Sequence, residues 1–382
     1  MDELHPLPRL RQSLMHGLLS LAILCLFSPP ATAERHKLAD FEVEVTEVAS
    51  GFDTPWGLAF LPGGGALVTE RGGRLWRLSA DGTRTRVRGV PKVATTGQGG
   101  LLDVLLPRDF AETRHVILSY AKPMRRGSGT AVGMGRLSRD GRRLTGFRVL
   151  VEMAPGTTGG RHFGSRLVEG RDGAIYVTVG DRGDRPSAQD PGRINGSVLR
   201  IARDGRAPAD NPFVSQAGAR PEIWSLGHRN PQGMALDPSG QLWAVEHGAQ
   251  GGDEINRIKR GANYGWPVIS YGQHYSGNKI GEGTSKPGME QPAHYWDPSI
   301  APSGMAILGN DLFPEWAGDF LVGSLKFDMI SRLENRAGRL TEVERIALPE
   351  TQRVRDVREA PDGSVWFLSE GNGAIYRMTP AR

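Results

Sequence analysis

The sequence has almost no cysteine: Cys25 is the only one among 382 residues. A single cysteine excludes a disulfide-stapled scaffold and any zinc or iron–sulfur site built on several cysteines. The sequence also lacks a large excess of either charge, because 47 Lys and Arg residues are nearly balanced by 42 Asp and Glu residues, for a net charge of +5. So balanced a composition argues against a disordered chain and against a dedicated nucleic-acid-binding protein. We expect no nucleic-acid partner.

Long hydrophobic runs are missing after residue 33. The apolar run at 18–27 has about ten residues, fewer than the roughly 20 that a membrane-spanning helix needs. It follows Arg9 and Arg11 and precedes Ala31-Thr-Ala33, so residues 1–33 are predicted to be a secretory signal peptide cut before Glu34. An uncleaved anchor is the alternative. A mature chain without cysteine or membrane span suits a periplasmic or secreted bacterial protein.

Glycine is abundant, with 52 residues, but lacks the G-x-y period of collagen. Instead, short strand-like runs recur at intervals of 45 to 78 residues, most of them introduced by a turn glycine. The runs begin at Gly65, Arg114, Gly173, Gly240, Gly318 and Gly363. Such spacing is typical of four-stranded propeller blades joined by loops of variable length.

We therefore predict an all-β chain, a six-bladed β-propeller of four-stranded antiparallel blades that forms one domain over residues 34–382. The run Phe41–Thr46 alternates like a strand. We expect it to pair with residues 373–377, which would close the ring and remove an open sheet edge. A pair of β-sandwiches is the alternative, and the even spacing of the runs disfavours it.

Polar segments interrupt the strand runs where a bare scaffold would not need them. Gln98 lies in a glycine-flanked loop, His162 precedes a strand-like run, and Arg229-Asn230 places a cation beside an amide. Loops of a propeller meet at one face around a central channel, so these side chains are predicted to converge there. The loop 246–254 offers carbonyls and carboxylates, the ligands of Ca²⁺, although it lacks the EF-hand pattern.

Cations and aromatic residues complete the candidate site. Lys326, Arg353 and Arg355 come from the last two blades and would suit a small polyanion. The longest insertion, between residues 240 and 318, is rich in aromatic side chains that suit sugar faces or a flat cofactor. These are Tyr264, Trp266, Tyr271, Tyr275, Tyr295 and Trp296. Of these, we expect Trp266 to belong to the blade core and Tyr275 to contact the cofactor.

The chain resembles the soluble, PQQ-dependent aldose sugar dehydrogenases, relatives of soluble glucose dehydrogenase. The resembling segments occur in order along the mature chain, at 51–57, 97–102, 227–233, 252–256, 263–267, 298–303 and 353–357. The resemblance implies a six-bladed propeller, in agreement with the period of the strand runs. It also implies oxidation of the C1 hydroxyl of aldoses to lactones, with hydride transfer to PQQ and electrons passed to an external acceptor.

The resemblance further implies roles for individual residues. His162 matches the general base, Arg229 the cation that stabilises charge on the quinone oxygen, and Asp253 is expected to orient His162. The residues that match PQQ contacts are Gln98, Arg229, Asn230, Ser299, Lys326, Arg353 and Arg355.

Two calcium ions are implied as well. The carbonyls of Gly248 and Ala249 match the ligands of an active-site Ca²⁺, and Glu254 and Tyr264 match a second, structural Ca²⁺ site. The family commonly carries Pro where this chain has Ala249, so the loop loses a stiffener and a lower Ca²⁺ affinity is expected.

Two other functions stay open at this point. One is a Ca²⁺-dependent lactonase or esterase on a six-bladed propeller, which would hold an axial ion with several carboxylates and need no quinone. The other is a non-catalytic propeller that binds glycans or proteins. The cluster of Lys326, Arg353 and Arg355 argues against the lactonase, because cations would compete with the metal.

Overall fold

The computed structural model describes Met1, residues 33–309 and residues 312–381. The signal peptide predicted at 1–33 lies outside the described residues except for Met1 and Ala33, so its boundary stays a prediction. From residue 33 onward the described chain belongs to one compact unit.

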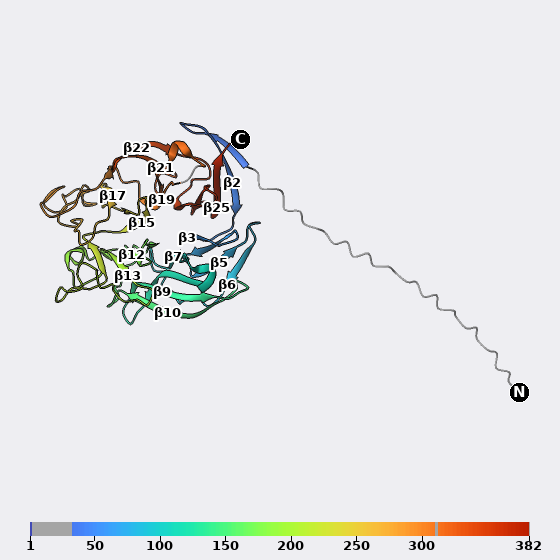
Figure 1. The fold of residues 1–382 in the computed structure, drawn as a ribbon, viewed down its shortest axis with the longest axis horizontal. Helices are drawn as coiled ribbons and strands as arrows, with labels where there is room; N and C mark the ends of the chain where they lie inside the picture. Colours follow the sequence, from blue (N-terminus) through green and yellow to red (C-terminus); the bar gives the residue numbers. More distant parts are fainter. Residues whose placement is uncertain (2–32, 310–311, 382) are drawn as a thin grey trace. The chain divides into compact units, whose positions relative to one another are not determined.

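The predicted six-bladed propeller is confirmed, because six antiparallel sheets lie around a common axis (Figure 1). In blades 1 to 5 the strands follow chain order from the centre outward. Blade 1 consists of β3 (Pro55–Phe60), β4 (Ala66–Glu70), β5 (Arg74–Leu78) and β6 (Arg84–Val87). Blade 2 consists of β7 (Leu101–Leu105), β8 (His115–Pro123), β9 (Ser128–Leu137) and β10 (Leu144–Glu152). Blade 3 consists of β11 (Leu167–Glu169), β12 (Ile175–Val179), β13 (Ser197–Ile201) and β14 (Ile223–Leu226). Blades 4 and 5 are β15 (Pro231–Leu236), β16 (Leu242–Glu246), β17 (Asp253–Arg257), β18 (His294–Trp296); and β19 (Pro302–Ile307), β20 (Phe320–Ser324), β21 (Ile330–Arg336), β22 (Arg339–Ile346).

Blade 6 is built from both ends of the described chain. Its strands are β23 (Val354–Glu359), β24 (Val365–Ser369), β25 (Ala374–Pro380), β2 (Glu42–Ala49) and β1 (Ala33–Lys37), in that order from the centre. The predicted pairing of the first mature strand with the last is confirmed, since β2 runs antiparallel to β25. The fifth strand, β1, was not predicted. It covers the edge that β2 would otherwise expose.

The innermost strands close the ring. β3, β7, β11, β15, β19 and β23 each contact the next, and β23 contacts β3. Helices are few and short in the described residues: α1 (Phe110–Thr113) and the 3₁₀ turns η1 (Arg185–Gln189) and η2 (Pro314–Trp316).

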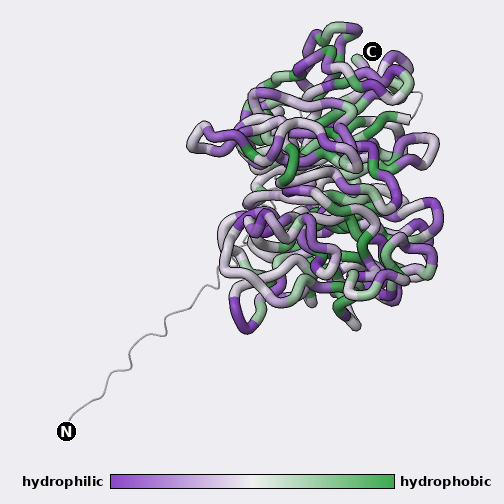
Figure 2. Tube along the Cα trace, turned by 90° about the vertical axis from the view of Figure 1, so that its left-hand side faces the viewer, coloured by the Kyte–Doolittle hydropathy of each residue, from purple (hydrophilic) through white to green (hydrophobic). Residues whose placement is uncertain are grey.

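All six predicted strand runs are the second strand of their blade, namely β4, β8, β12, β16, β20 and β24. Six apolar clusters fill the spaces between neighbouring blades. A second strand is therefore covered on both faces, and every residue of β4, β12, β16 and β20 is buried. Because both faces are buried, these strands read as continuous apolar runs rather than alternating ones. Hydrophilic segments gather in the loops (Figure 2).

Charged side chains tie three blades together at the hub. Arg166, which precedes β11, lies 3.1 Å from Oδ1 of Asp103 and 3.1 Å from Oδ1 of Asp356. Arg358 pairs with the same two carboxylates at 3.0 and 2.9 Å. Asp103 belongs to β7 and Asp356 to β23. The negative charges of two carboxylates and the positive charges of two guanidinium groups thus balance each other where the innermost strands meet.

Candidate active site

Strand direction brings the predicted residues to one end of the ring. Strands alternate within a blade, so the start of an innermost strand and the end of a second strand lie at the same end. The predicted residues that precede or begin an innermost strand are Gln98, His162, Arg229, Asn230, Ser299, Arg353 and Arg355, and those that follow a second strand are Gly248, Ala249 and Lys326.

His162 is fixed at both its backbone and its side chain. Its backbone adopts φ +55°, in the left-handed region that non-glycine residues seldom occupy. Its N–H donates to Oε1 of Gln98 at 2.7 Å, and Nδ1 lies 2.6 Å from Oδ1 of Asp181. A carboxylate can only accept, so Nδ1 carries the proton and Nε2 keeps its lone pair. Nε2 has no hydrogen-bond partner among the described residues.

Asp181, rather than Asp253, orients His162. Asp181 follows β12 in the same blade. Its Oδ1 also accepts from Gly183 N at 2.6 Å, and its Oδ2 accepts from Nε1 of Trp266 at 2.8 Å. Burial would raise the pKa of Asp181, but the hydrogen bonds from His162, Gly183 and Trp266 outweigh it and hold the pKa below its usual value.

The expectation that Asp253 orients His162 was wrong. Asp253 uses its carboxylate on its own blade and the next: Oδ1 accepts from Gly248 N at 2.8 Å. Oδ2 accepts from the Ser299 hydroxyl at 2.6 Å and from Ala301 N at 2.9 Å. Asp253 therefore holds the Gly248–Ala249 turn against the segment that carries Ser299.

The sequence analysis did not identify Asp181, although a signal for it exists. Asp181 stands just beyond the end of a second strand, in the same place relative to the repeat as the 246–254 loop. Comparing the residues that follow each of the six strand runs would have placed it in the ring of site residues.

Arg229 and Asn230 leave buried donors without partners. The Arg229 guanidinium donates to His247 O at 3.2 Å and lies over the Trp266 ring, but its Nε has no partner among the described residues. Asn230 accepts from Gly164 N at 3.1 Å, while its Nδ2 is also unpartnered. Arg229 is only 7% exposed, and burial lowers its pKa. Arg229 Nε and Asn230 Nδ2 are thus buried donors that lack an acceptor, which is costly unless a ligand supplies one.

His247 is a further site residue that the sequence analysis missed. Its Nε2–H donates to Pro302 O at 2.7 Å. Burial, followed by the charge of Arg229, lowers the pKa of His247 to about 3. His247 is therefore neutral and lines the site, rather than acting as a second base.

Two of the three predicted cations, Arg353 and Arg355, gather around an unpredicted carboxylate, whereas the Lys326 ammonium lies over the Phe327 ring. Glu370 accepts from Arg355 Nη2 at 2.9 Å and from Arg353 Nη2 at 3.2 Å. Arg353 also donates to Leu325 O at 2.9 Å, next to the exposed Lys326. Despite burial, the two arginines keep the pKa of Glu370 below its usual value. One of the three positive charges is thus offset before any ligand binds.

Two small cavities meet at His247. One is lined by Trp56, Arg71, Gln98, Leu102, Phe163, Gly164, Gln232, His247, Leu325 and Arg355. The other is lined by Gly227, Arg229, Glu246, His247, Gly248, Gly252, Glu254, Tyr264, Trp266, Ile269 and Ser270. Of the predicted cofactor contacts, Gln98 and Arg355 line the first cavity and Arg229 lines the second. The second cavity is also lined by three of the four predicted calcium ligands, namely Gly248, Glu254 and Tyr264.

The second cavity is lined by two carboxylates, the buried Glu246 and the partly buried Glu254. Burial and the nearby Glu246 raise the pKa of Glu254 to about 8. Glu246 accepts from Nδ1 of His228 at 2.8 Å, whereas among the described residues the Glu254 carboxylate accepts only from Asn256, at 3.2 Å. The Tyr264 hydroxyl bonds to the 257–259 segment instead, so toward the cavity Tyr264 can offer only its carbonyl. Such a pair of acids suits a hard cation.

The Gly248 turn leaves no space for a side chain. A Cβ at Gly248 would lie 2.2 Å from the carbonyl oxygens of both Gly251 and Gly252. Among the described residues no group of three or more His, Cys, Asp or Glu side chains is arranged to hold a metal. The ligands predicted for the active-site ion are backbone carbonyls, which such a group would not include.

The aromatic insertion divides into buried and exposed residues. Trp266 is buried as predicted, but it packs beside the site and bonds to Asp181 rather than lying within a blade. Tyr264 and Trp296 are also buried. Tyr275 is 76% exposed, and Tyr271 stacks on the exposed Tyr295 with ring centroids 4.1 Å apart.

No helix in the described part of the chain is long and apolar enough to cross a membrane.

Comparison with known proteins places this arrangement in context. The family described as glucose / sorbosone dehydrogenase matches residues 52–377. Aldose sugar dehydrogenase YliI of Escherichia coli strain K12 is 44% identical over 346 residues, covering 88% of this chain and 93% of the relative. The apo-form crystal structure of the soluble aldose sugar dehydrogenase from Escherichia coli has a TM-score of 0.85 at 43% identity, covering 89% of this chain and 100% of that one. The PQQ-bound aldose sugar dehydrogenase of Streptomyces coelicolor has a TM-score of 0.74 at 28% identity, covering 92% and 99%.

Proposed function

Because the chain belongs to the glucose/sorbosone dehydrogenase family, a family of sugar oxidoreductases, we propose that it oxidises the C1 hydroxyl of aldoses to lactones, using PQQ and Ca²⁺. The observation that carries the proposal is the His162–Asp181 pair, which leaves Nε2 of His162 free at the end of the ring where unpartnered cationic and amide donors converge. A relative named for its PQQ-bound form supports the choice of cofactor.

The residues present fit a flat polyanion such as PQQ, which carries three carboxylates. The unpartnered Nε of Arg229 and Nδ2 of Asn230 supply donors that need an acceptor. Arg353, Arg355 and Lys326 supply three positive charges, of which Glu370 offsets one. We propose that these residues hold the cofactor, together with Gln98, Ser299 and Tyr275.

Calcium fits the carbonyls and acids of the neighbouring cavity. We propose that the Gly248 and Ala249 carbonyls hold the ion beside the cofactor, with Asp253 fixing their turn through Gly248 N. We propose a second ion at Glu254 and the Tyr264 carbonyl. The raised pKa of Glu254 supports this, because a bound cation would keep that carboxyl ionised at neutral pH.

The chain's own groups carry the proton chemistry. Nε2 of His162 accepts the proton of the C1 hydroxyl, and Asp181 stabilises the resulting imidazolium through Nδ1. Burial and the charge of Arg229 lower the pKa of His162, so the imidazole is neutral and ready to accept at pH 7. Arg229 and Asn230 donate toward oxygens that gain negative charge. When bound, the quinone supplies the acceptor for two electrons and the C1 hydrogen.

The test is reconstitution of the protein with PQQ and Ca²⁺. We expect a quinone absorbance band, and reduction of a dye when an aldose is added. Absence of both binding and dye reduction would overturn the proposal. Lactone hydrolysis without PQQ would instead favour the lactonase alternative. If neither activity is found, the non-catalytic binding propeller is favoured.

The predicted leader completes the proposal. We propose that residues 1–33 direct export to the bacterial periplasm or exterior, where an external acceptor takes the electrons. Sequencing of the mature N-terminus after expression in a bacterium checks this, with cleavage expected before Glu34.

A further inference from the structure

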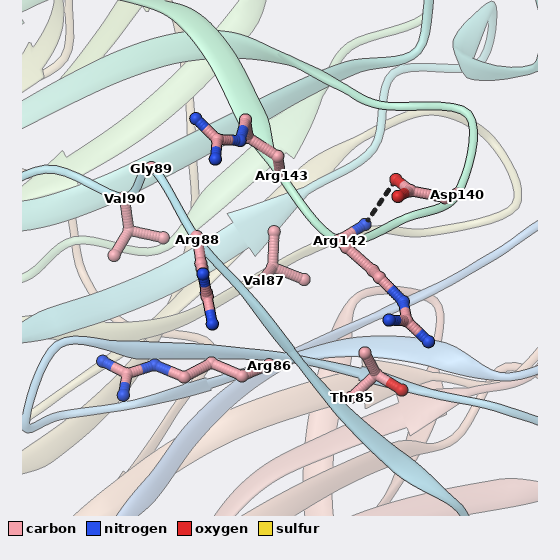
Figure 3. A pocket seen from close by; sticks show the side chains of 9 residues that line it. All are labelled: Thr85, Arg86, Val87, Arg88, Gly89, Val90, Asp140, Arg142 and Arg143. Carbon is pink, nitrogen blue, oxygen red and sulfur yellow. Dashed lines mark hydrogen bonds between the residues drawn. The ribbon is translucent and has the colours of Figure 1, made fainter.

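A larger hollow lies away from the two cavities of the candidate active site. It measures about 820 Å³ and lies between β6 of blade 1 and the turn that joins β9 to β10 in blade 2 (Figure 3). It is lined by residues 85–90 and by Asp140, Arg142 and Arg143. Strand β10 begins at this hollow and runs toward the end of the ring where His162 lies, so the two sites are separated by the length of a strand.

The backbone around this hollow is tied across the two blades. Arg88 N donates to Arg142 O at 2.9 Å, and Leu144 N donates to Arg88 O at 2.7 Å. Gly89 has φ +86°, and a Cβ there would lie 2.1 Å from Leu144 O, so the close approach requires glycine. The side chains that the hollow presents are therefore carried on a fixed framework.

Four guanidinium groups surround the hollow: those of Arg86, Arg88, Arg142 and Arg143 (Figure 3). All four residues are exposed, and within the described part of the chain no side-chain hydrogen bond or ion pair engages any of them. By contrast, Arg332 pairs with both Asp40 and Asp319.

The only acid in the lining is already engaged. Asp140 Oδ1 accepts from the Ser138 hydroxyl at 2.5 Å and from the backbone N–H of Arg142 at 3.1 Å. These hydrogen bonds lower the pKa of Asp140, so it stays ionised and holds the turn. Four cations less one anion give the lining a formal charge of 4 − 1 = +3.

We propose that this hollow, which we call the Arg86–Arg143 hollow, binds an anion carrying two or more phosphate groups. Guanidinium groups match phosphate oxygens in paired hydrogen bonds, and the donors of these four arginines are not used by side-chain hydrogen bonds within the described residues. Each phosphate carries about −1.5 to −2 at neutral pH, so two of them balance a lining charge of +3. The volume also exceeds what a single phosphate fills.

The first test measures binding of inorganic diphosphate by titration calorimetry at low salt. We expect one site in the wild-type protein and at least about a 10-fold weaker affinity for Arg88→Gln/Arg143→Gln, because two charge-assisted contacts are lost. The matched control, Arg125→Gln/Arg126→Gln, removes two charges from exposed positions at the β8–β9 turn and should keep wild-type affinity. Unchanged thermal unfolding of both variants shows that folding is intact.

Three outcomes would overturn the site. The wild-type protein could fail to bind diphosphate, the Arg88→Gln/Arg143→Gln variant could retain its affinity, or the control could lose as much. A loss confined to Arg353→Gln/Arg355→Gln would place the anion in the candidate active site and also refute the Arg86–Arg143 hollow.

A second arm distinguishes the source of the phosphate. The protein is sedimented with phosphatidylcholine vesicles that contain or lack cardiolipin, a lipid with two phosphates. Co-sedimentation that needs cardiolipin and is lost in Arg88→Gln/Arg143→Gln identifies lipid headgroups as the source. Diphosphate binding without co-sedimentation identifies a free phosphorylated molecule.

Discussion

The Nδ1 atom of His162 and the Oδ1 atom of Asp181 lie 2.6 Å apart, although one residue precedes and the other follows the β11–β12 strand pair of blade 3. The antiparallel pairing of these strands brings the two loops together, so the blade itself sets the tautomer of the imidazole. Several predictions about catalysis depend on that contact.

Replacing His162 with Ala should abolish most turnover while leaving PQQ bound. A general base contributes about 10²- to 10⁴-fold, so dye reduction with aldose should fall by that factor while the quinone absorbance is retained. His36→Ala, in β1 of the outer sheet edge, is the control and should keep wild-type turnover. Normal turnover by His162→Ala would exclude this residue as the base.

The acid limb of the pH profile should move in opposite directions in two variants. Proton acceptance needs neutral His162, whose pKa burial and Arg229 lower and Asp181 raises. The wild-type limb should therefore lie below the ordinary value of about 6.5. Asp181→Asn removes the group that raises this pKa and should move the limb to lower pH, whereas Arg229→Gln should move it to higher pH.

The measurement is kcat/KM against pH, which reports the free enzyme. Asp181→Asn should also lose at least about 10-fold in kcat, as part of the general-base contribution, because Nδ1 loses its anionic partner. If the acid limbs of Asp181→Asn and Arg229→Gln moved in the same direction, the assignment of His162 as the base would be contradicted.

Asp253→Asn should weaken calcium binding without moving the acid limb. Asp253 holds Gly248 N at 2.8 Å and does not contact His162. Groups that orient metal ligands typically contribute about 10- to 100-fold to affinity, so Ca²⁺ titration of the reconstituted enzyme should show a loss of that size. A shifted pH limb with unchanged Ca²⁺ affinity would restore Asp253 as the partner of the base.

Ala249→Pro should strengthen calcium binding. Among the described residues no hydrogen bond of good geometry from Ala249 N is present, but Ala249 and Gly251 form an isolated antiparallel bridge, so the variant also tests whether that bridge is needed. A compatible proline stabilises by about 0.4–1 kcal/mol, which corresponds to roughly a 2- to 5-fold lower Kd for Ca²⁺. A weaker affinity would show that the turn needs the freedom that alanine gives it.

Asp103→Ala should strongly destabilise the fold. It leaves Arg166 and Arg358 with only Asp356 between them at the buried hub, and breaking such a buried network costs about 3–5 kcal/mol. Glu334→Ala removes an exposed ion pair with Arg336 and should cost at most about 1 kcal/mol. Denaturant unfolding of both variants checks the contrast, and equal losses would refute the role of the hub.

The propeller could be predicted from the sequence because its most regular element is also its most apolar. The second strands are enclosed by neighbouring blades, so their composition repeats even where the loops differ in length. The pairing of β2 with β25 followed from the need to cover a sheet edge. Strand β1 escaped prediction because its residues, Ala33–Lys37, are largely exposed and carry no apolar signal.

The partners within the site were harder to predict than its members. Sequence order placed Arg353 and Arg355 together, but Glu370 joins them only through the turn between β24 and β25. Asp181 follows β12 and Asp253 begins β17, so both acids lie at the site end of their strands, and only the three-dimensional path of the chain decides which one reaches His162. Local pattern identifies loops that converge, whereas hydrogen-bond partners depend on tertiary geometry.

The completion of blade 6 by β2 and β25 also has a consequence for biosynthesis. Residues 374–380 are synthesised long after the strand they pair with, at 42–49. Blades 1 to 5 can assemble as they are synthesised, but blade 6 stays incomplete until β25 has been made. Until then β2 lacks its partner strand, and a chaperone that shields that edge would have its greatest effect in this interval.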